Sequence, residues 1–208
     1  MTEKIPFTVR EATEADYPGV VSALTDAFEA DPVMSQAMGG AHRAKKVKAL
    51  FEHQISSTYG PKGNIDIAVA EDGFVLGAAL WIDPQAQKGG FLDDLRSLPS
   101  YARALGFALP AAVVTEMKLL AMRPRFPHWY LYTIGVHTDA RDHGVGGALL
   151  DFRTARLGEY PAYLEASTFR SAALYRKRGF VELGRYRSEV PAVGMWHPAP
   201  VSAIDSAL

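Results

Sequence analysis

The stretch that decides the fold runs from Tyr130 to Leu150 and reads YLYTIGVHTDARDHGVGGALL. Its first seven residues are mostly β-branched, aromatic or apolar, which favours a strand. A short polar loop follows, and three glycines then lead into apolar residues at helical spacing. We therefore expect a strand, a loop and a helix whose first turn is rich in glycine.

A glycine-rich helix start of this kind suits the binding of phosphate. Its first turn presents backbone N–H groups without helical partners, together with the positive end of the helix dipole. Gly144, Gly146 and Gly147 have no Cβ, so the backbone can approach an anion closely. Arg141 adds a cation that can either close the turn or contact the anion. The glycines alone fit equally a helix start that binds nothing.

Two other nucleotide-binding motifs fit this stretch less well. A P-loop ends in Gly-Lys-Ser or Gly-Lys-Thr, and the sequence contains neither tripeptide. A dinucleotide fingerprint is expected near a first βαβ unit with its own glycine spacing, whereas these glycines occur late in the chain.

Hydrophobic periodicity and turn residues divide the rest of the chain into strands and helices. Strands are expected at residues 7–10, 65–70, 74–82, 129–136, 162–166 and 180–186. A first helix is expected from the N-cap candidate Thr13 to about residue 28, and others at about 41–59, 145–157 and 171–178.

The proline-punctuated segment 83–127 separates two of these strands and contains three further candidate helices, at 91–98, 101–105 and 111–122. No repeat or linker divides the chain. One domain is therefore expected over residues 1–198, with a poorly ordered tail at 199–208.

Composition excludes several classes of protein. A net charge of -1 without long runs of one sign disfavours general nucleic-acid binding and membrane-surface binding, because both need a basic face. The absence of cysteine rules out disulfides, thiolate metal sites and cysteine nucleophiles. The N-terminus lacks a signal-peptide core, and no apolar stretch is long enough to span a bilayer. A cytoplasmic location is expected.

The pattern Arg141-x-x-Gly144-x-Gly146 has the form of the coenzyme A motif Arg/Gln-x-x-Gly-x-Gly/Ala. Downstream, YLEAS at 163–167 and LYRKRGF at 174–180 follow in matching order and separation. Together these blocks resemble the GNAT acetyltransferases over about two-thirds of the chain. The resemblance implies an α+β fold in which helices flank a central mixed, mostly antiparallel sheet. HWYL at 128–131, PAYLEAS at 161–167 and the long middle segment most closely resemble puromycin N-acetyltransferase-like members.

The resemblance also implies acetyl-CoA as acyl donor, with direct transfer to an amine and no acyl-enzyme. The end of the fourth expected strand would diverge from its neighbour and offer backbone groups to the pantetheine arm. The implied coenzyme-binding residues are Ile134, Val136, Arg141, Gly144, Val145, Gly146, Gly147, Ser171 and Arg178. Ser171, Tyr175 and Arg178 would share one helix face. The family often has asparagine where this chain has Ser171, whose hydroxyl offers fewer donors than an amide.

Tyr175 is the implied general acid, which would protonate the leaving thiolate; a tyrosine that only packs is the alternative. Glu165 is the first candidate for the general base, and a purely structural carboxylate is equally open. His128, Tyr132 and Glu29 are alternative bases. His137, Asp139 and His143 share a short loop, but their spacing fits no recognised metal site, and no metal is expected.

The expected function is acetylation of a primary amine of a small molecule. The alternatives are a protein lysine or N-terminal acetyltransferase, and a non-catalytic acyl-CoA-binding sensor. The apolar segment 83–127 favours an acceptor with an aromatic or aliphatic body. No nucleic-acid or membrane partner is expected, and a homodimer is left open. The sequence specifies neither the acceptor amine nor the acyl chain.

Overall fold

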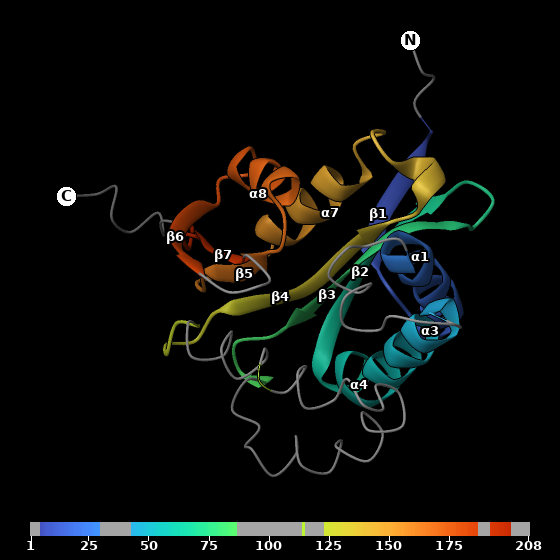
Figure 1. Ribbon diagram of the computed structural model, residues 1–208, viewed down its shortest axis with the longest axis horizontal. Helices are drawn as coiled ribbons and strands as arrows, with labels where there is room; N and C mark the ends of the chain where they lie inside the picture. The colour runs from blue at the N-terminus through green and yellow to red at the C-terminus, as the bar shows by residue number, and fades with distance from the viewer. Residues whose placement is uncertain (1–4, 30–42, 87–113, 115–122, 187–191, 201–208) are drawn as a thin grey trace.

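The computed structural model describes residues 5–29, 43–86, 114, 123–186 and 192–200. Seven strands form one sheet in the order β1-β2-β3-β4-β5-β7-β6 (Figure 1). They are β1 Phe7–Glu11, β2 Gly63–Ala70, β3 Val75–Ile82, β4 Trp129–Val136, β5 Ala162–Ala166, β6 Val181–Tyr186 and β7 Ala192–His197. Only β4 and β5 are parallel to each other, and every other neighbouring pair is antiparallel. The expected mixed, mostly antiparallel sheet is confirmed.

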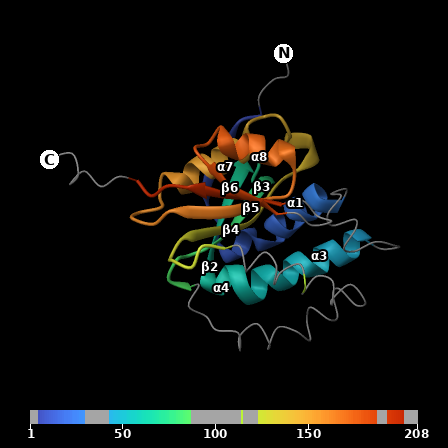
Figure 2. The same cartoon turned by 60° about the vertical axis from the view of Figure 1, so that its left-hand side comes forward.

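Helices cover both faces of the sheet. One face carries α1 (Tyr17–Glu29) and α3 (Arg43–Gln54), and the opposite face carries α7 (Val145–Thr154) and α8 (Phe169–Arg176) (Figure 2). Each face has its own apolar core, so the sheet is buried between two layers of helices. No described helix is both long and apolar enough to cross a membrane.

The sequence analysis placed six of the seven strands and missed β7. It also treated residues 41–59 as a single helix, whereas α3 ends at Gln54 and a π-helical turn, η2 (Ile55–Tyr59), follows. The short α4 (Gly60–Lys62) follows and leads into β2. Apart from residue 114, the three candidate helices between residues 91 and 122 lie outside the described residues, as does the tail from residue 201.

A buried ion pair fixes α7 to the sheet. Arg153 of α7 donates from Nε to Asp66 Oδ2 of β2 at 2.9 Å and makes a second contact with Asp66 Oδ1. Arg153 also donates to Glu11 Oε1 of β1 at 3.1 Å. Both partners of the main pair are buried. Burial raises the pKa of Asp66, and the guanidinium of Arg153 opposes that shift by stabilising the carboxylate.

Candidate active site

The β4 and β5 strands diverge in the middle of the sheet. They pair only at Trp129–Ala162, Tyr130–Tyr163 and Leu131–Leu164, and β4 then continues to Val136 without pairing to β5. The divergence coincides with a bulge, because Leu80 pairs with Thr133 while Trp81 pairs with Leu131, which leaves Tyr132 as the extra residue. The β5-facing edge of β4 beyond Leu131, which includes Ile134 and Val136, therefore has backbone groups that no neighbouring strand engages.

The first turn of α7 lies just beyond the end of this edge. Gly144 precedes the helix in the left-handed region, with φ of 87°, where a residue with a Cβ is strained. The first hydrogen bond at the helix start runs from the Ala148 N–H to the Gly144 carbonyl at 3.0 Å. The three preceding amides, of Val145, Gly146 and Gly147, thus have no carbonyl acceptor within α7. The glycine turn has the free donors that a phosphate site requires.

Arg178 lies across this first turn. A Cβ on Gly147 would approach Arg178 Nη2 to 2.2 Å, so a side chain here would displace the guanidinium from its present position. Arg178 Nε also lies 3.3 Å from Asp151 Oδ1 on the next turn of α7. A Cβ on Gly146 would by contrast meet Val136 and Leu174 at 3.5 Å, an ordinary contact distance. The chain itself therefore tolerates a small side chain at Gly146, and the guanidinium of Arg178 stands beside the free amides.

The helix expected at 171–178 is displaced by two residues. Thr168 is its N-cap: Thr168 Oγ1 accepts from the Ser171 N–H at 3.0 Å, and Ser171 Oγ donates to the Thr168 carbonyl at 2.9 Å. At the other end Gly179, with φ of 85°, follows the last turn. Arg178 thus lies beyond α8, so the expected shared helix face with Ser171 and Tyr175 was wrong for Arg178. Ser171 reinforces the cap with the hydroxyl that was expected to face the coenzyme.

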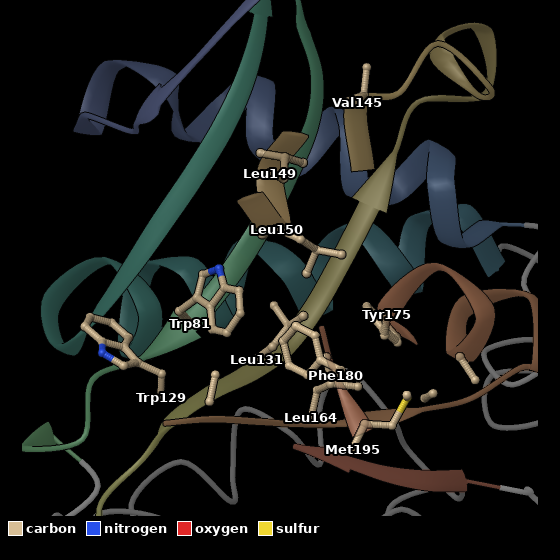
Figure 3. Packing of buried hydrophobic residues seen from close by; sticks show 14 of the residues in the cluster. Trp81, Trp129, Leu131, Val145, Leu149, Leu150, Leu164, Tyr175, Phe180 and Met195 are labelled. Atoms are coloured by element: carbon tan, nitrogen blue, oxygen red, sulfur yellow. The ribbon is translucent and has the colours of Figure 1, made fainter. Parts of the chain in front are cut away.

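Tyr175 lies on the α8 side of the divergence. Its side chain is 6% exposed and belongs to the same cluster as Leu131 and Leu164, the last paired residues of β4 and β5 (Figure 3). Its ring stands 5.9 Å from that of Phe180. Burial raises its pKa, which keeps the phenol protonated at neutral pH. Among the described residues no partner hydrogen-bonds its hydroxyl.

Glu165 of β5 is already engaged with two side chains. Its Oε2 accepts from the Tyr130 hydroxyl at 2.8 Å, and its Oε1 lies 3.3 Å from Arg123 Nε. Arg123 also donates to the Tyr130 hydroxyl at 2.6 Å. Both carboxylate oxygens of Glu165 therefore have partners among the described side chains. Glu165, Tyr130 and Arg123 thus form one hydrogen-bonded group, and Arg123 is a neighbour that the sequence analysis missed.

The other candidate bases lie apart from one another. His128 is buried, which lowers its pKa, and its Nδ1 lies 2.7 Å from the Phe126 carbonyl. Because a carbonyl only accepts, Nδ1 carries the proton and Nε2 is the basic nitrogen. The bulge residue Tyr132 accepts a hydrogen bond from the side-chain amide of Gln54. Glu29, at the end of α1, lines a shallow hollow of about 330 Å³ whose lining includes neither His128 nor Tyr132.

The three residues weighed as metal ligands have other contacts. His137 faces Asp26 and Asp139, each at 3.7 Å, and His143 Nδ1 accepts from the Ile5 N–H at 3.2 Å. Across the ranges that the structure describes, no three His, Asp or Glu side chains gather as a metal site.

Residues 111–182, which include the glycine turn and α8, match the family model described as "Acetyltransferase (GNAT) domain". A solved structure from Corynebacterium glutamicum, described as "histone acetyltransferase HPA2 and related acetyltransferase", is 36% identical. The match covers 95% of this chain and 98% of that chain, with a TM-score of 0.73. The chain belongs to the GNAT acetyltransferase family.

More distant GNAT structures share the fold. The ribosomal-protein-S18-alanine N-acetyltransferase from Escherichia coli is 16% identical, with a TM-score of 0.56 and coverage of 95% of this chain and 97% of that one. A GCN5-related N-acetyltransferase from Kribbella flavida is 19% identical, with a TM-score of 0.52 and coverage of 92% and 97%. The closer resemblance to puromycin N-acetyltransferase-like members of the GNAT family stays a prediction.

Proposed function

We propose that this GNAT acetyltransferase moves an acetyl group from acetyl-CoA to a primary amine of a small molecule by direct attack. The observation that carries the proposal is the divergence of β4 and β5 beside the free amides of α7. The unpaired edge of β4 leads to the start of α7. An extended ligand that carries a phosphate could therefore lie along the strand edge and place its phosphate at the helix start.

The residues present fit the coenzyme. The amides of Val145, Gly146 and Gly147 would hold the pyrophosphate, and Arg178 stands beside them as a cation. The unpaired edge of β4 would hydrogen-bond the pantetheine arm. When bound, acetyl-CoA supplies an activated thioester.

In the proposed reaction the neutral amine nitrogen bonds to the acetyl carbon and the carbon–sulfur bond breaks. The acetylated nitrogen loses one proton to become an amide, and the thiolate sulfur takes up a proton. Tyr175 is the donor on the α8 side, and its raised pKa means that it stays protonated until charge develops on sulfur. The amine must first lose its own proton. Glu165 and His128 are the candidates to receive it directly or through water, and burial keeps the imidazole of His128 neutral and able to accept a proton.

Aromatic side chains beside the divergence support a compact acceptor. Tyr130 and Tyr163 stack at 6.4 Å, His128 meets Tyr163 at 5.7 Å, and Phe126 meets Trp196 at 5.1 Å. These residues lie on the sheet face opposite α7 and α8, since Leu131 and Leu164 on the same strands face those helices. Such a face suits aromatic or aliphatic amines.

A second candidate is acetylation of a protein, at a lysine or an N-terminal amine. The observation that favours it is the description of the 36% identical Corynebacterium glutamicum protein as a histone acetyltransferase and related acetyltransferase. A basic peptide would need acidic groups at its binding surface. The carboxylate of Glu165, however, is paired with Arg123, which leaves the small amine as the better-supported acceptor.

An acceptor screen separates these candidates. Release of free coenzyme A thiol would be followed with wild-type protein, acetyl-CoA and either small amines or lysine-containing and N-terminal peptides. We expect small aromatic and aliphatic amines to exceed peptides in kcat/KM by about tenfold or more, since a hydrophobic site discriminates at about that level. Turnover of peptides alone would establish the second candidate, and coenzyme binding without turnover of any amine would indicate a sensor.

Tyr175→Phe tests the catalytic assignment. It should lower kcat about tenfold or more, because a proton donor is lost, while the dissociation constant of acetyl-CoA stays within about twofold. The rate of coenzyme A thiol release gives kcat, and calorimetric titration gives the dissociation constant of acetyl-CoA. Tyr160→Phe, a half-buried tyrosine between α7 and β5, is the matched control and should retain full activity. Wild-type kcat in the Tyr175 variant would make Tyr175 a packing residue.

A further inference from the structure

Asp26 joins α1 to the loop that follows β4. Its Oδ2 accepts from the Thr138 N–H at 2.6 Å and from Thr138 Oγ1 at 2.7 Å. Its Oδ1 lies 3.7 Å from His137 Nε2. Thr138 opens the short helix η5 (Thr138–Ala140), so the carboxylate satisfies the first amide of that turn, as a side-chain cap does. These partners are 112 residues apart in sequence, so the contact is a tertiary tether.

A second bond ties the other end of the loop to the same helix. Arg141 Nη2 donates to the Ala27 carbonyl in the last turn of α1 at 3.2 Å. Just before these bonds in both segments, α1 packs directly on β4, since a Cβ on Gly135 would lie 2.8 Å from Leu24 Cδ2. Loop 137–141 is therefore held at both ends by consecutive residues of α1, and the free amides of α7 begin four residues later, at Val145.

We propose that Asp26 is a positioning residue for the coenzyme site, holding loop 137–141 so that the first turn of α7 meets the pyrophosphate at the end of β4. The proposal rests on the proposed function, since it concerns the same coenzyme. A loop that is already fixed loses little conformational entropy when the ligand binds. The affinity for the ligand is therefore higher than it would be with a mobile loop.

The direction in which the dissociation constant of the coenzyme changes, when Asp26 is replaced, distinguishes a positioning role from charge repulsion alone. The hydrogen bonds from Thr138, with His137 and Arg141 nearby, outweigh the opposing effect of burial and hold the pKa of Asp26 below its ordinary value, so this carboxylate is charged at neutral pH. A negative charge near a phosphate site is repulsive. Removal of the charge alone should therefore tighten coenzyme binding, whereas removal of a tether should weaken it.

The test is calorimetric titration of the full chain with coenzyme A. Asp26→Ala should raise the dissociation constant about tenfold, as expected for hydrogen bonds to a charged group. Asp139→Ala is the matched control, because that carboxylate belongs to the same loop, is 90% exposed and, among the residues that the structure describes, lies 3.7 Å from His137 as its one ion-pair partner. It should leave the dissociation constant unchanged or lower it. Asp26→Asn keeps an oxygen acceptor for the Thr138 N–H and should recover most of the lost affinity.

Kinetics with an accepted amine add an independent readout. In Asp26→Ala the KM for acetyl-CoA should rise, while kcat at saturating coenzyme and the KM for the amine stay within about twofold. A general weakening of the fold would change all three. If Asp26→Ala does not fold, Thr138→Val removes only the hydroxyl bond at 2.7 Å and should still raise the dissociation constant about threefold.

Two results would contradict the proposal in distinguishable ways. Equal affinity in wild type and Asp26→Ala, or tighter binding in Asp26→Ala, would overturn the positioning role while leaving the coenzyme site in place. Failure of the wild-type chain to bind coenzyme A would overturn the proposed function, and the positioning role with it.

Discussion

Gly146→Glu should abolish the rise in melting temperature that acetyl-CoA produces in the wild-type chain. At a ligand concentration of about 100 times the dissociation constant, wild type gains about 2.7 kcal/mol, or roughly 5–10 °C for a chain of this size. In the variant a carboxylate stands among the free amides of Val145 and Gly147, where the pyrophosphate is expected. The two anions would compete for the same donors and repel each other. Thermal unfolding with and without acetyl-CoA measures the effect.

Gly146→Ala is the matched control for this change. A Cβ there meets Val136 and Leu174 at 3.5 Å, so the fold accepts it without rearrangement. The alanine variant should retain most of the acetyl-CoA shift, because it adds no charge. If the glutamate variant folds and keeps the full shift, the phosphate site is not at the start of α7.

Arg153→Met should reduce the free energy of unfolding by about 3–5 kcal/mol, because it leaves the buried carboxylate of Asp66 without its cation. For a domain of this size that loss lowers the melting temperature by about 10 °C or more. Denaturant titration at neutral pH measures the free energy directly. The loss extends beyond stability, since α7 carries the glycine turn and is held to β1 and β2 through this side chain.

The double variant Asp66→Leu with Arg153→Met tests the cause. Replacing both ions with apolar groups removes the unpaired charge, so most of the stability should return. Glu11→Gln should cost no more than about 1 kcal/mol, because Glu11 is largely exposed and only supplements the pair. A single Arg153→Met variant that unfolds like wild type would show that Asp66 is stable there without its partner.

The sheet could be predicted from the sequence wherever alternation and turn residues agreed. The β4 and β5 strands were placed with their correct ends, because their apolar runs are bounded by proline, glycine and polar residues. The β7 strand was missed because Gly194 interrupts its pattern. That glycine is explained only by the neighbouring strand, since a Cβ there would come within 2.9 Å of the Tyr163 hydroxyl. The side chain of Tyr163 on the neighbouring strand accounts for the glycine at position 194, and the sequence around Gly194 gives no sign of that contact.

The candidate site was likewise predictable from the sequence only in part. The glycine turn was predictable, because the residues that shape it are contiguous. The contacts of Asp26 with Thr138, Arg123 with Glu165 and Arg153 with Asp66 were not, since each joins residues 42 or more apart in sequence. Arg178 was expected beside the coenzyme, but its contact with Gly147 arises only when α7 and α8 pack together. The local sequence indicated where an anion would bind, whereas tertiary packing determined which residues fix the conformation of that site.

The divergence of β4 and β5 also has a consequence for how the two parts of the sheet are held together. The β1 to β4 strands pair in chain order, and β5, β7 and β6 form a second group, so each group consists of strands that are consecutive in the chain. Only three residue pairs join the two groups across the sheet. Buried side chains from both groups pack in one cluster across this seam, so side-chain packing supplements the sparse backbone pairing there. A ligand lying along the seam would contact both groups at once and stabilise the native arrangement of the two.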